Sequence, residues 1–307
     1  MSVLAIIGPT ASGKSDLAFH VADRLAASGW RVEVVAVDAF TVYRGMDVGT
    51  AKPTPSERRR VAHHMVDVLD PSEEVTVAWF QRHARRAIDA IRERGAVPLL
   101  VGGSGLYWRA VVDPLEFPPT DPDVRARVEQ QVGDDPVAAH ERLRGLDPEA
   151  AARIEPSNLR RVVRALEVLE LTGRRFSSFR TAWEGHDGIY PDLRVVQLDP
   201  PGDRLRLAIE SRVERMLDDG LIDETRALVR RGPLSRTAAQ AIGYAEALAV
   251  IDGSLAHADL VESVSTRTWR YARRQRAWFR RDPRGPRIAA IGATREAIDH
   301  LCAPETS

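Results

Sequence analysis

The chain contains almost no lysine and almost no cysteine. Of its 44 basic residues only Lys14 and Lys52 are lysines, and Cys302 is its single cysteine. One cysteine excludes a disulfide within the chain and a cysteine-cluster metal site, as expected for a protein of the reducing cytosol. No apolar run reaches the about 18 residues of a membrane span. The first apolar segment begins at Val3, which leaves no room for a cleavable signal, so we expect no membrane association.

The net charge of the chain is zero, because its 307 residues include 44 acidic and 44 basic ones. A nucleic-acid surface, if present, must therefore be a local patch. Because arginine has replaced lysine almost everywhere, a remaining lysine suggests a task that needs a compact ammonium group rather than a planar guanidinium group. That argument is strong for Lys14, whereas Lys52 is as readily explained by chance.

Apolar runs alternate with helical periodicity in the first hundred residues. We predict three buried strands and two helices, namely Val3–Ile7, Val32–Val37 and Val97–Val101, and Asp16–Ser28 and Trp79–Arg94. This rhythm predicts an α/β fold with a parallel sheet, which binds ligands at the carboxyl ends of its strands.

Four prolines in the nine residues from Pro114 to Pro122 indicate a domain boundary. The pattern beyond is helical until a strand at Val195–Leu198, after which helices extend to about Arg281 and a last short strand is predicted at Ile288–Ile291. We therefore expect a core formed by residues 1–114 and 191–307, interrupted by a helical insertion at residues 115–190.

A phosphate-binding loop follows the first strand. The segment Gly8-Pro9-Thr10-Ala11-Ser12-Gly13-Lys14-Ser15 fits G-x-x-x-x-G-K-[ST] between a strand and a helix, which is the context this motif requires. Backbone amides and the helix N-terminus bind phosphate oxygens, Lys14 adds charge, and the Ser15 hydroxyl can hold Mg²⁺. The motif predicts a diphosphate or triphosphate ligand but not hydrolysis.

Polar side chains end the next two strands. Asp38 could hold magnesium, act as a base toward a substrate, or cap a turn, and Ser104 lies in a glycine-rich turn (Gly102–Gly105) that suits a ligand oxygen or a helix cap. Arginine gathers at two further places. Arg160, Arg161 and Arg164 lie opposite the apolar face of one helix, as a solvated or an RNA-binding face would. The stretch from Arg267 to Arg281 has seven arginines, no acid and interleaved aromatics, which suits RNA and equally an amphipathic surface helix.

Together these segments resemble the bacterial tRNA dimethylallyltransferase family. They run in order over about nine-tenths of the chain: GPTASGKS (Gly8–Ser15), VYRGMDVGTAKP (Val42–Pro53), PLLVGGSGLY (Pro98–Tyr107), DPDVRARVE (Asp121–Glu129), RALEVLELTG (Arg164–Gly173), RVERML (Arg212–Leu217), QAIGY (Gln240–Tyr244) and YARRQRAWFR (Tyr271–Arg280). The resemblance implies a P-loop NTPase-like core with a helical insertion that grips the tRNA anticodon stem-loop. It also implies Mg²⁺, dimethylallyl diphosphate in the P-loop, and prenyl transfer to N6 of the adenosine 3′-adjacent to the anticodon, in tRNAs reading codons that start with U. No obligate protein partner is implied.

Roles follow from the resemblance position by position. Asp38 resembles the general base, Ser104 a substrate-contacting threonine, and Arg212 a diphosphate-binding arginine. Residues that resemble tRNA contacts are Asp38, Ala39, Phe40, Thr41, Ser104, Arg125, Arg160, Arg161, Arg164, Gln240, Gly243 and Tyr244. Ala39 and Thr41 replace the family's usual serine and glutamine, which affects details of base recognition.

Three other functions are compatible with parts of the sequence. A small-molecule kinase would hold ATP in the P-loop and needs no RNA surface. An isopentenyltransferase acting on free AMP has no need of a large insertion. A non-enzymatic RNA-binding P-loop module would not need a base at Asp38.

Overall fold

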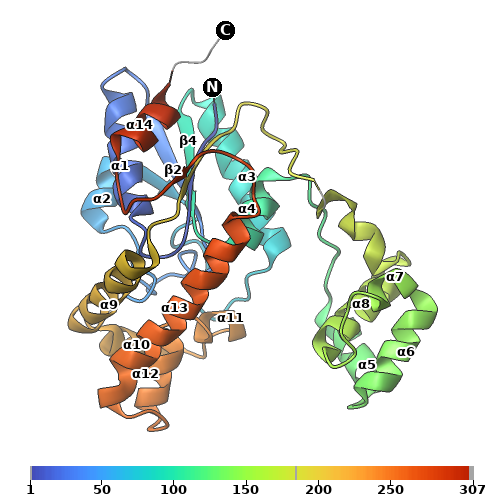
Figure 1. The fold of residues 1–307 in the computed structure, drawn as a ribbon. Helices are drawn as coiled ribbons and strands as arrows, with labels where there is room; N and C mark the ends of the chain where they lie inside the picture. Colours follow the sequence, from blue (N-terminus) through green and yellow to red (C-terminus); the bar gives the residue numbers. More distant parts are fainter. Residues whose placement is uncertain (1, 184, 304–307) are drawn as a thin grey trace. The chain divides into compact units, whose positions relative to one another are not determined.

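The chain folds into two compact units in the computed structural model, which describes residues 2–183 and 185–303. One unit combines the residues up to Val112 with those from Gly188 onward, and the other comprises Asp113–Asp187 (Figure 1). These limits lie two and three residues from the insertion boundaries expected from the sequence.

A six-stranded parallel sheet forms the centre of the first unit, in the order β3-β2-β4-β1-β5-β6. Its strands are β1 (Leu4–Ile7), β2 (Val32–Val37), β3 (Ala62–His64), β4 (Val97–Gly102), β5 (Arg194–Leu198) and β6 (Arg287–Ile288). β1, β2 and β4 are almost wholly buried because helices cover both faces, which explains why their sequences are apolar apart from the buried Glu33 of β2. The predicted α/β fold with a P-loop-like parallel sheet is confirmed.

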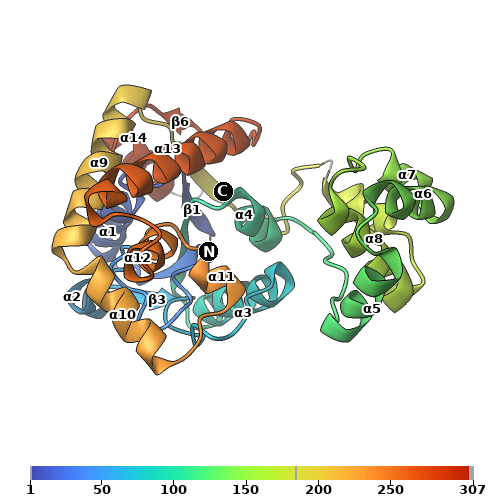
Figure 2. The ribbon, with the colours of Figure 1, turned by 90° about the horizontal axis from the view of Figure 1, so that it is seen from below.

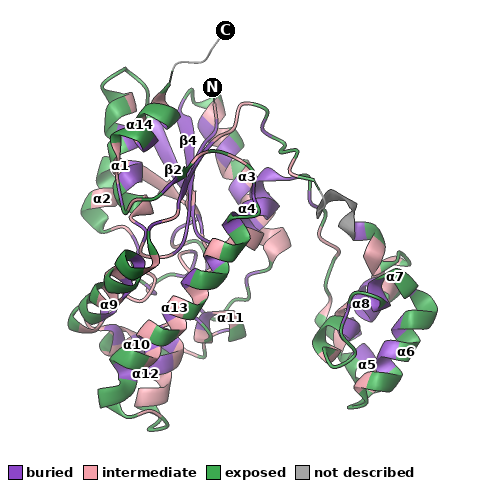
Figure 3. Ribbon diagram, in the orientation of Figure 1, coloured by how far each residue is buried: buried purple, intermediate pink, exposed green. Residues whose placement is uncertain are grey.

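Helices cover both faces of this sheet (Figures 1 and 3). On one face lie α1 (Lys14–Ala26) and α14 (Arg295–Cys302), whose Leu17, Val21 and Leu301 pack into a core with β1 and β4. On the other face lie α3 (Val77–Glu93) and α4 (Gly105–Val112), which contribute Phe80, Ile88 and Trp108 to a larger core. The short α2 (Pro55–Arg60) precedes β3.

A group of helices gathers beside the carboxyl ends of the strands (Figure 2). They are α9 (Gly202–Asp218), α10 (Leu221–Arg231), α11 (Arg236–Ala239), α12 (Tyr244–Ile251), the 3₁₀ helix η2 (His257–Asp259) and α13 (Leu260–Phe279). α9 and α13 pack together through a buried core that includes Leu205, Ile209 and Val264. None of the helices in the described parts of the chain is long and apolar enough to cross a membrane.

The second unit is a small helical bundle with its own core. Its helices are α5 (Pro122–Val132), α6 (Pro136–Leu146), α7 (Pro148–Ala151), α8 (Leu159–Thr172) and the 3₁₀ helix η1 (Phe176–Trp183). α5, α6 and α7 each begin with an aspartate cap followed by proline, a combination that satisfies exposed helical amides and presets φ. Val128, Leu143 and Val162 are among the residues of its core.

Candidate active site

The loop between β1 and α1 has the shape of a phosphate-binding loop. Gly13 adopts φ 80°, and a Cβ there would lie 2.3 Å from the backbone nitrogen of Gly292, so only glycine fits. The buried Ser12 hydroxyl donates to the Pro9 carbonyl at 2.8 Å and braces the loop. α1 begins at Lys14, where its unpaired amides and its dipole favour an anion.

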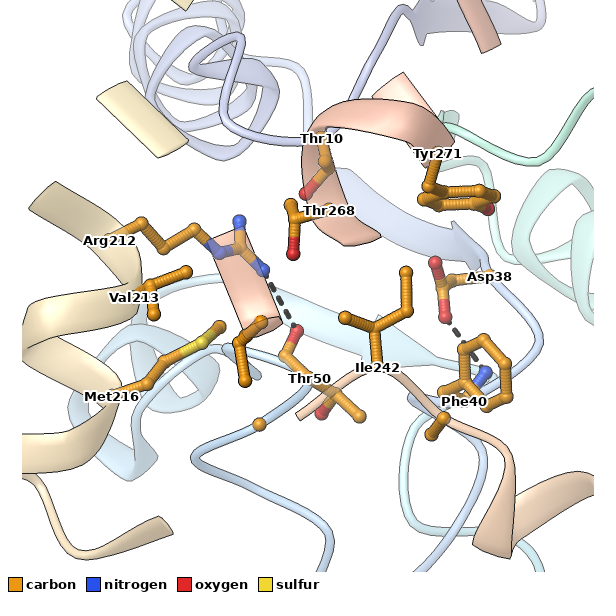
Figure 4. Close-up of a pocket in the computed structure, with 13 residues that line it drawn as sticks. Thr10, Asp38, Phe40, Thr50, Arg212, Val213, Met216, Ile242, Thr268 and Tyr271 are labelled. Carbon is orange, nitrogen blue, oxygen red and sulfur yellow. Dashed lines mark hydrogen bonds between the residues drawn. The ribbon is translucent and has the colours of Figure 1, made fainter. Parts of the chain in front are cut away.

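A cavity enclosing about 590 Å³ of space, including its open mouth, lies beside this loop. Figure 4 shows residues from distant parts of the chain turned toward it, with Arg212 on α9 and Tyr271 on α13. Its lining comprises Thr10, Asp38, Phe40, Gly49, Thr50, Arg212, Val213, Met216, Ala241, Ile242, Val264, Thr268 and Tyr271. Three residues predicted from the sequence to act together, Thr10, Asp38 and Arg212, therefore meet in one cavity.

Asp38 follows β2 directly and its two carboxylate oxygens differ. Oδ1 accepts hydrogen bonds from the backbone amides of Phe40 at 2.8 Å and Thr41 at 3.3 Å. Oδ2 has no hydrogen-bond partner among the described residues, while the side chain lines the cavity. The turn-capping role and a substrate-facing role are thus compatible, because one oxygen serves each.

Two cations accompany Asp38. Lys14 Nζ donates to the Pro9 carbonyl at 2.5 Å, and Arg212 Nη2 lies 3.5 Å from the Thr50 carbonyl. Burial, reinforced by the nearby Arg212 and partly opposed by Asp38, lowers the pKa of Lys14 to about 7. Burial likewise lowers the pKa of Arg212, with Asp38 acting in the opposite direction. Two desolvated cations near one carboxylate leave uncompensated positive charge, which suits a diphosphate.

Ser15 occupies the first turn of α1. Its side chain is exposed and its hydroxyl has no hydrogen-bond partner in the parts of the chain that are described. The described residues contain no group of three or more His, Cys, Asp and Glu side chains placed to hold a metal. Ser15 therefore fits Mg²⁺ only if most other ligands are diphosphate oxygens and water, the arrangement that Mg²⁺ usually adopts with phosphate ligands.

Ser104 lies in the turn between β4 and α4, where its carbonyl accepts from Trp108 N at 2.8 Å. It is not among the residues that line the cavity. Its hydroxyl makes no hydrogen bond within the described chain, and its neighbour Gly103 approaches the Gly8 carbonyl closely. The structure thus brings the turn that contains Ser104 next to the phosphate loop.

Residues expected to contact tRNA in the first unit divide into accessible and buried ones. Gln240 is exposed, whereas Gly243 and Tyr244 are buried. The Tyr244 hydroxyl accepts from Gly49 N at 3.1 Å and donates to Glu224 at 2.5 Å. Tyr244 therefore holds the loop that contributes Gly49 and Thr50 to the cavity, its side chain is buried in this conformation, and its contact with tRNA stays a prediction.

Ala39 and Thr41, which flank Phe40, are partly buried. Thr41 Oγ1 donates to the Met65 carbonyl at 3.5 Å, so its side chain contacts the loop that contains Met65. Of this segment only Asp38 and Phe40 line the cavity.

The arginines expected to contact tRNA in the second unit also differ from one another. Arg160 and Arg161 are exposed and form no ion pair among the described residues. Arg164 instead donates to the carbonyls of Pro118 at 2.7 Å and Pro119 at 2.9 Å and pairs with the fully buried Glu167 at 2.9 Å. Arg125 pairs with Glu129 at 3.1 Å. Arg164 is thus committed to the fold of this unit, rather than lying on an open face with the other two.

Lys52 is buried away from the cavity lining. Its ammonium group donates to the Tyr43 carbonyl and to Asp47 at 2.8 Å and Asp67 at 2.6 Å. Arg58 pairs with the other oxygen of Asp67. The second surviving lysine therefore ties residues 43–67 together, and its ammonium group is engaged within this segment.

The sequence assigns no role at the site to Thr268 or Gln275. Thr268 lines the cavity together with Thr50 and Ile242, which belong to the segments VYRGMDVGTAKP and QAIGY, and Gln275 contacts the phosphate loop. The available signal was Gln275 itself, which is the one uncharged polar side chain within the arginine-rich run from Arg273 to Arg276.

Fold and site together define an α/β protein of the P-loop-like type with a cavity at the carboxyl edge of its sheet that is lined by Asp38 and Arg212. The family model described as IPP transferase matches residues 41–282. The chain belongs to this family.

Curated relatives span nearly the same length. The chain is 47% identical to a tRNA dimethylallyltransferase of Thermobifida fusca over 285 residues, which are 92% of this chain and 88% of that protein. It is 48% identical to the enzyme of the same name from Streptomyces coelicolor over 301 residues, 97% of this chain and 94% of that one.

Solved structures agree with this assignment. The tRNA isopentenylpyrophosphate transferase of Bacillus halodurans superimposes with a TM-score of 0.69 at 38% identity, covering 97% of this chain and 93% of that chain. A eukaryotic dimethylallyltransferase captured acting on tRNA gives a TM-score of 0.77 at 26% identity, covering 98% of this chain and 76% of its own.

Proposed function

We propose that the protein transfers the dimethylallyl group of dimethylallyl diphosphate to N6 of the adenosine 3′-adjacent to the anticodon, in tRNAs that read codons starting with U. The relatives named above support this reaction, since they are tRNA dimethylallyltransferases. The observation that best supports it is chemical. One cavity combines a carboxylate oxygen without a protein partner, on Asp38, with the nearby cations Arg212 and Lys14.

The diphosphate is the leaving group. Lys14, Arg212 and the amides of the phosphate loop stabilise the charge that develops on it as the C1–O bond of the donor breaks. The Ser15 hydroxyl would hold Mg²⁺ at the phosphate loop, where the ion would supply further charge neutralisation.

Asp38 acts on the acceptor. The exocyclic amine of adenine forms the new N6–C1 bond, and its surplus proton passes to Oδ2 of Asp38, the oxygen not engaged by Phe40 and Thr41. Because the reacting amine lies within a stacked loop, the adenine leaves the stack to reach the carboxylate.

Surface arginines provide the affinity for RNA. Arg270, Arg273 and Arg274 on α13 are exposed and have no ion-pair partner among the described residues, which suits phosphate contacts. In the second unit Arg160 and Arg161 have the same properties and suit the anticodon stem-loop.

The decisive assay supplies unmodified tRNA, dimethylallyl diphosphate and Mg²⁺, and analyses the nucleosides produced. We expect N6-dimethylallyladenosine at the position after the anticodon and one pyrophosphate per transfer. A parallel reaction with AMP in place of tRNA should give no product. Phosphate release from ATP without RNA would count against this reaction.

A further inference from the structure

The side chain of Gln275 joins two loops of the site that are far apart in sequence. Its Oε1 accepts from Thr10 N in the phosphate loop at 2.9 Å, and its Nε2 donates to the Gly103 carbonyl at 2.7 Å. Gln275 is 5% exposed, so neither bond competes with bulk water. One amide thus spans from the loop after β1 to the turn after β4, next to Ser104.

The chemistry of both partners fixes the orientation of this amide. The Thr10 N–H can donate only to Oε1, and the Gly103 carbonyl can accept only from Nε2. An amide with these two atoms exchanged would therefore lose both hydrogen bonds. The contact is also close, because a Cβ on Gly103 would lie 2.5 Å from Nε2 and 3.0 Å from the Gly8 carbonyl. Glycine at position 103 is therefore required for this bridge to form.

The bridge extends toward the cavity. Tyr271, one turn earlier on α13, lines the cavity and also interacts with the Gln275 amide. The helix that presents arginines to solvent therefore contacts, through its buried side, the loop proposed to bind diphosphate.

We infer that Gln275 is a positioning residue that sets the spacing between the phosphate loop and the Ser104 turn, and thereby aligns the donor with its acceptor. The inference builds on the proposed use of a diphosphate donor. Gln275 touches no reacting atom in this account. It acts by holding the Thr10 amide and the Gly103 carbonyl at a fixed separation, and displacements of about 1 Å in such a site can cost about 10²-fold in rate.

A matched control comes from a second buried glutamine. Gln197 on β5 is 2% exposed and its Nε2 also donates to backbone carbonyls, those of Asp282 at 2.9 Å and Arg284 at 2.6 Å. It contacts no residue of the cavity lining through these bonds. Gln197→Met therefore measures the cost of losing a buried amide whose own hydrogen bonds run to residues 282 and 284 and not to the phosphate loop or the Ser104 turn.

The first test compares Gln275→Met with Gln197→Met. Both should lower Tm by similar amounts. Only Gln275→Met should raise KM for dimethylallyl diphosphate about tenfold and lower kcat by about 10- to 100-fold, with Kd for tRNA unchanged. Donor KM and kcat within twofold of wild type would overturn the inference, as would equal kinetic losses in both variants.

The second test uses Gln275→Glu, which has the shape of glutamine. When the glutamate is ionised, it still accepts a hydrogen bond from Thr10 N. Its second carboxylate oxygen then faces the Gly103 carbonyl without a proton to donate, and its negative charge repels the diphosphate. When protonated it can donate to Gly103 and restores the whole bridge. The ratio of its kcat/KM to that of wild type should therefore rise as pH falls from 8 to 5.5, whereas the ratio for Gln275→Met should stay flat. A flat ratio for Gln275→Glu would contradict the bridge.

Calorimetry with magnesium pyrophosphate separates this inference from the proposed reaction. Gln275→Met should bind pyrophosphate about tenfold more weakly than wild type and Gln197→Met, whether or not the wild type transfers a prenyl group. Unchanged pyrophosphate affinity would refute the positioning role, while absent transfer by the wild type would refute only the proposed reaction.

Discussion

The lowered pKa of Lys14 predicts that diphosphate binding takes up a proton. With a pKa of about 7 in the unliganded protein, Lys14 is charged in roughly one molecule in ten at pH 8 and in roughly nine in ten at pH 6. A bound diphosphate places negative charge beside the ammonium and returns its pKa toward the usual range. Binding should therefore take up about 0.9 proton at pH 8 and about 0.1 at pH 6.

The same linkage fixes how affinity varies with pH. Because the charged form of Lys14 binds the anion, the association constant should fall by about 50-fold between pH 7 and pH 9 if the pKa is about 7. A lysine with its ordinary pKa would stay charged over this interval and give nearly constant affinity.

Isothermal titration calorimetry with dimethylallyl diphosphate and Mg²⁺ measures both quantities, when repeated in buffers of different ionisation enthalpy. Lys14→Arg is the control, because arginine stays charged throughout, and protonation of the ligand itself is common to both proteins. The difference between them isolates Lys14. If wild type and Lys14→Arg show the same proton uptake and the same slope of affinity against pH, Lys14 is not the titrating group and the account of the buried charges is wrong.

Three further changes test other parts of the site. Asp38→Asn keeps an acceptor for the Phe40 amide. It should lower the single-turnover rate by about 10²–10⁴, with affinities for donor and tRNA near wild type. A large loss of donor affinity would indicate that Asp38 binds a metal instead. Replacing Arg160 and Arg161 by alanine should weaken tRNA binding and reduce the slope of log affinity against log salt by about 2 in filter-binding titrations. Arg164→Ala, which removes the ion-pair partner of the buried Glu167, should instead lower Tm. Equal effects of both replacements on RNA binding would refute the assignment of Arg164 to the fold and of Arg160 and Arg161 to RNA. Ser15→Ala should raise the Mg²⁺ concentration needed for half-maximal activity, and an unchanged requirement would remove Ser15 as a ligand.

The elements that could be predicted from sequence are those with strong local patterns. β2 has the limits expected from its apolar run, and the phosphate loop follows β1 as its glycines and Lys14 indicate. The sequence predicts no helix over α4, although one of the two readings of Ser104 is a helix cap and the helix begins at the next residue, Gly105. β3 has three residues and little periodicity, so only its pairing with β2 makes it a strand.

The candidate site was predictable where a residue ends a strand and not where it depends on distant contacts. Asp38 follows β2, so its position at the ligand edge was implied by the fold. Tyr244 belongs to a motif shared with the family, but only the folded chain reveals that its hydroxyl is consumed by Glu224 and Gly49. The role of Gln275 likewise depends on hydrogen bonds to Thr10 and Gly103, which lie 265 and 172 positions away in the sequence.

Acidic and basic side chains are unevenly distributed between the two units of the chain. Residues 113–187 contain 15 acidic and 11 basic side chains, so the helical unit is net negative, although the whole chain is neutral. A net-negative unit does not attract a polyanion over distance, and contacts at Arg160 and Arg161 therefore depend on local geometry. The stretch from Arg267 to Arg281 contains no acid, and its exposed arginines supply a field that favours approach of phosphate. We propose that the exposed arginines of α13 contribute the larger, salt-sensitive share of the affinity for RNA.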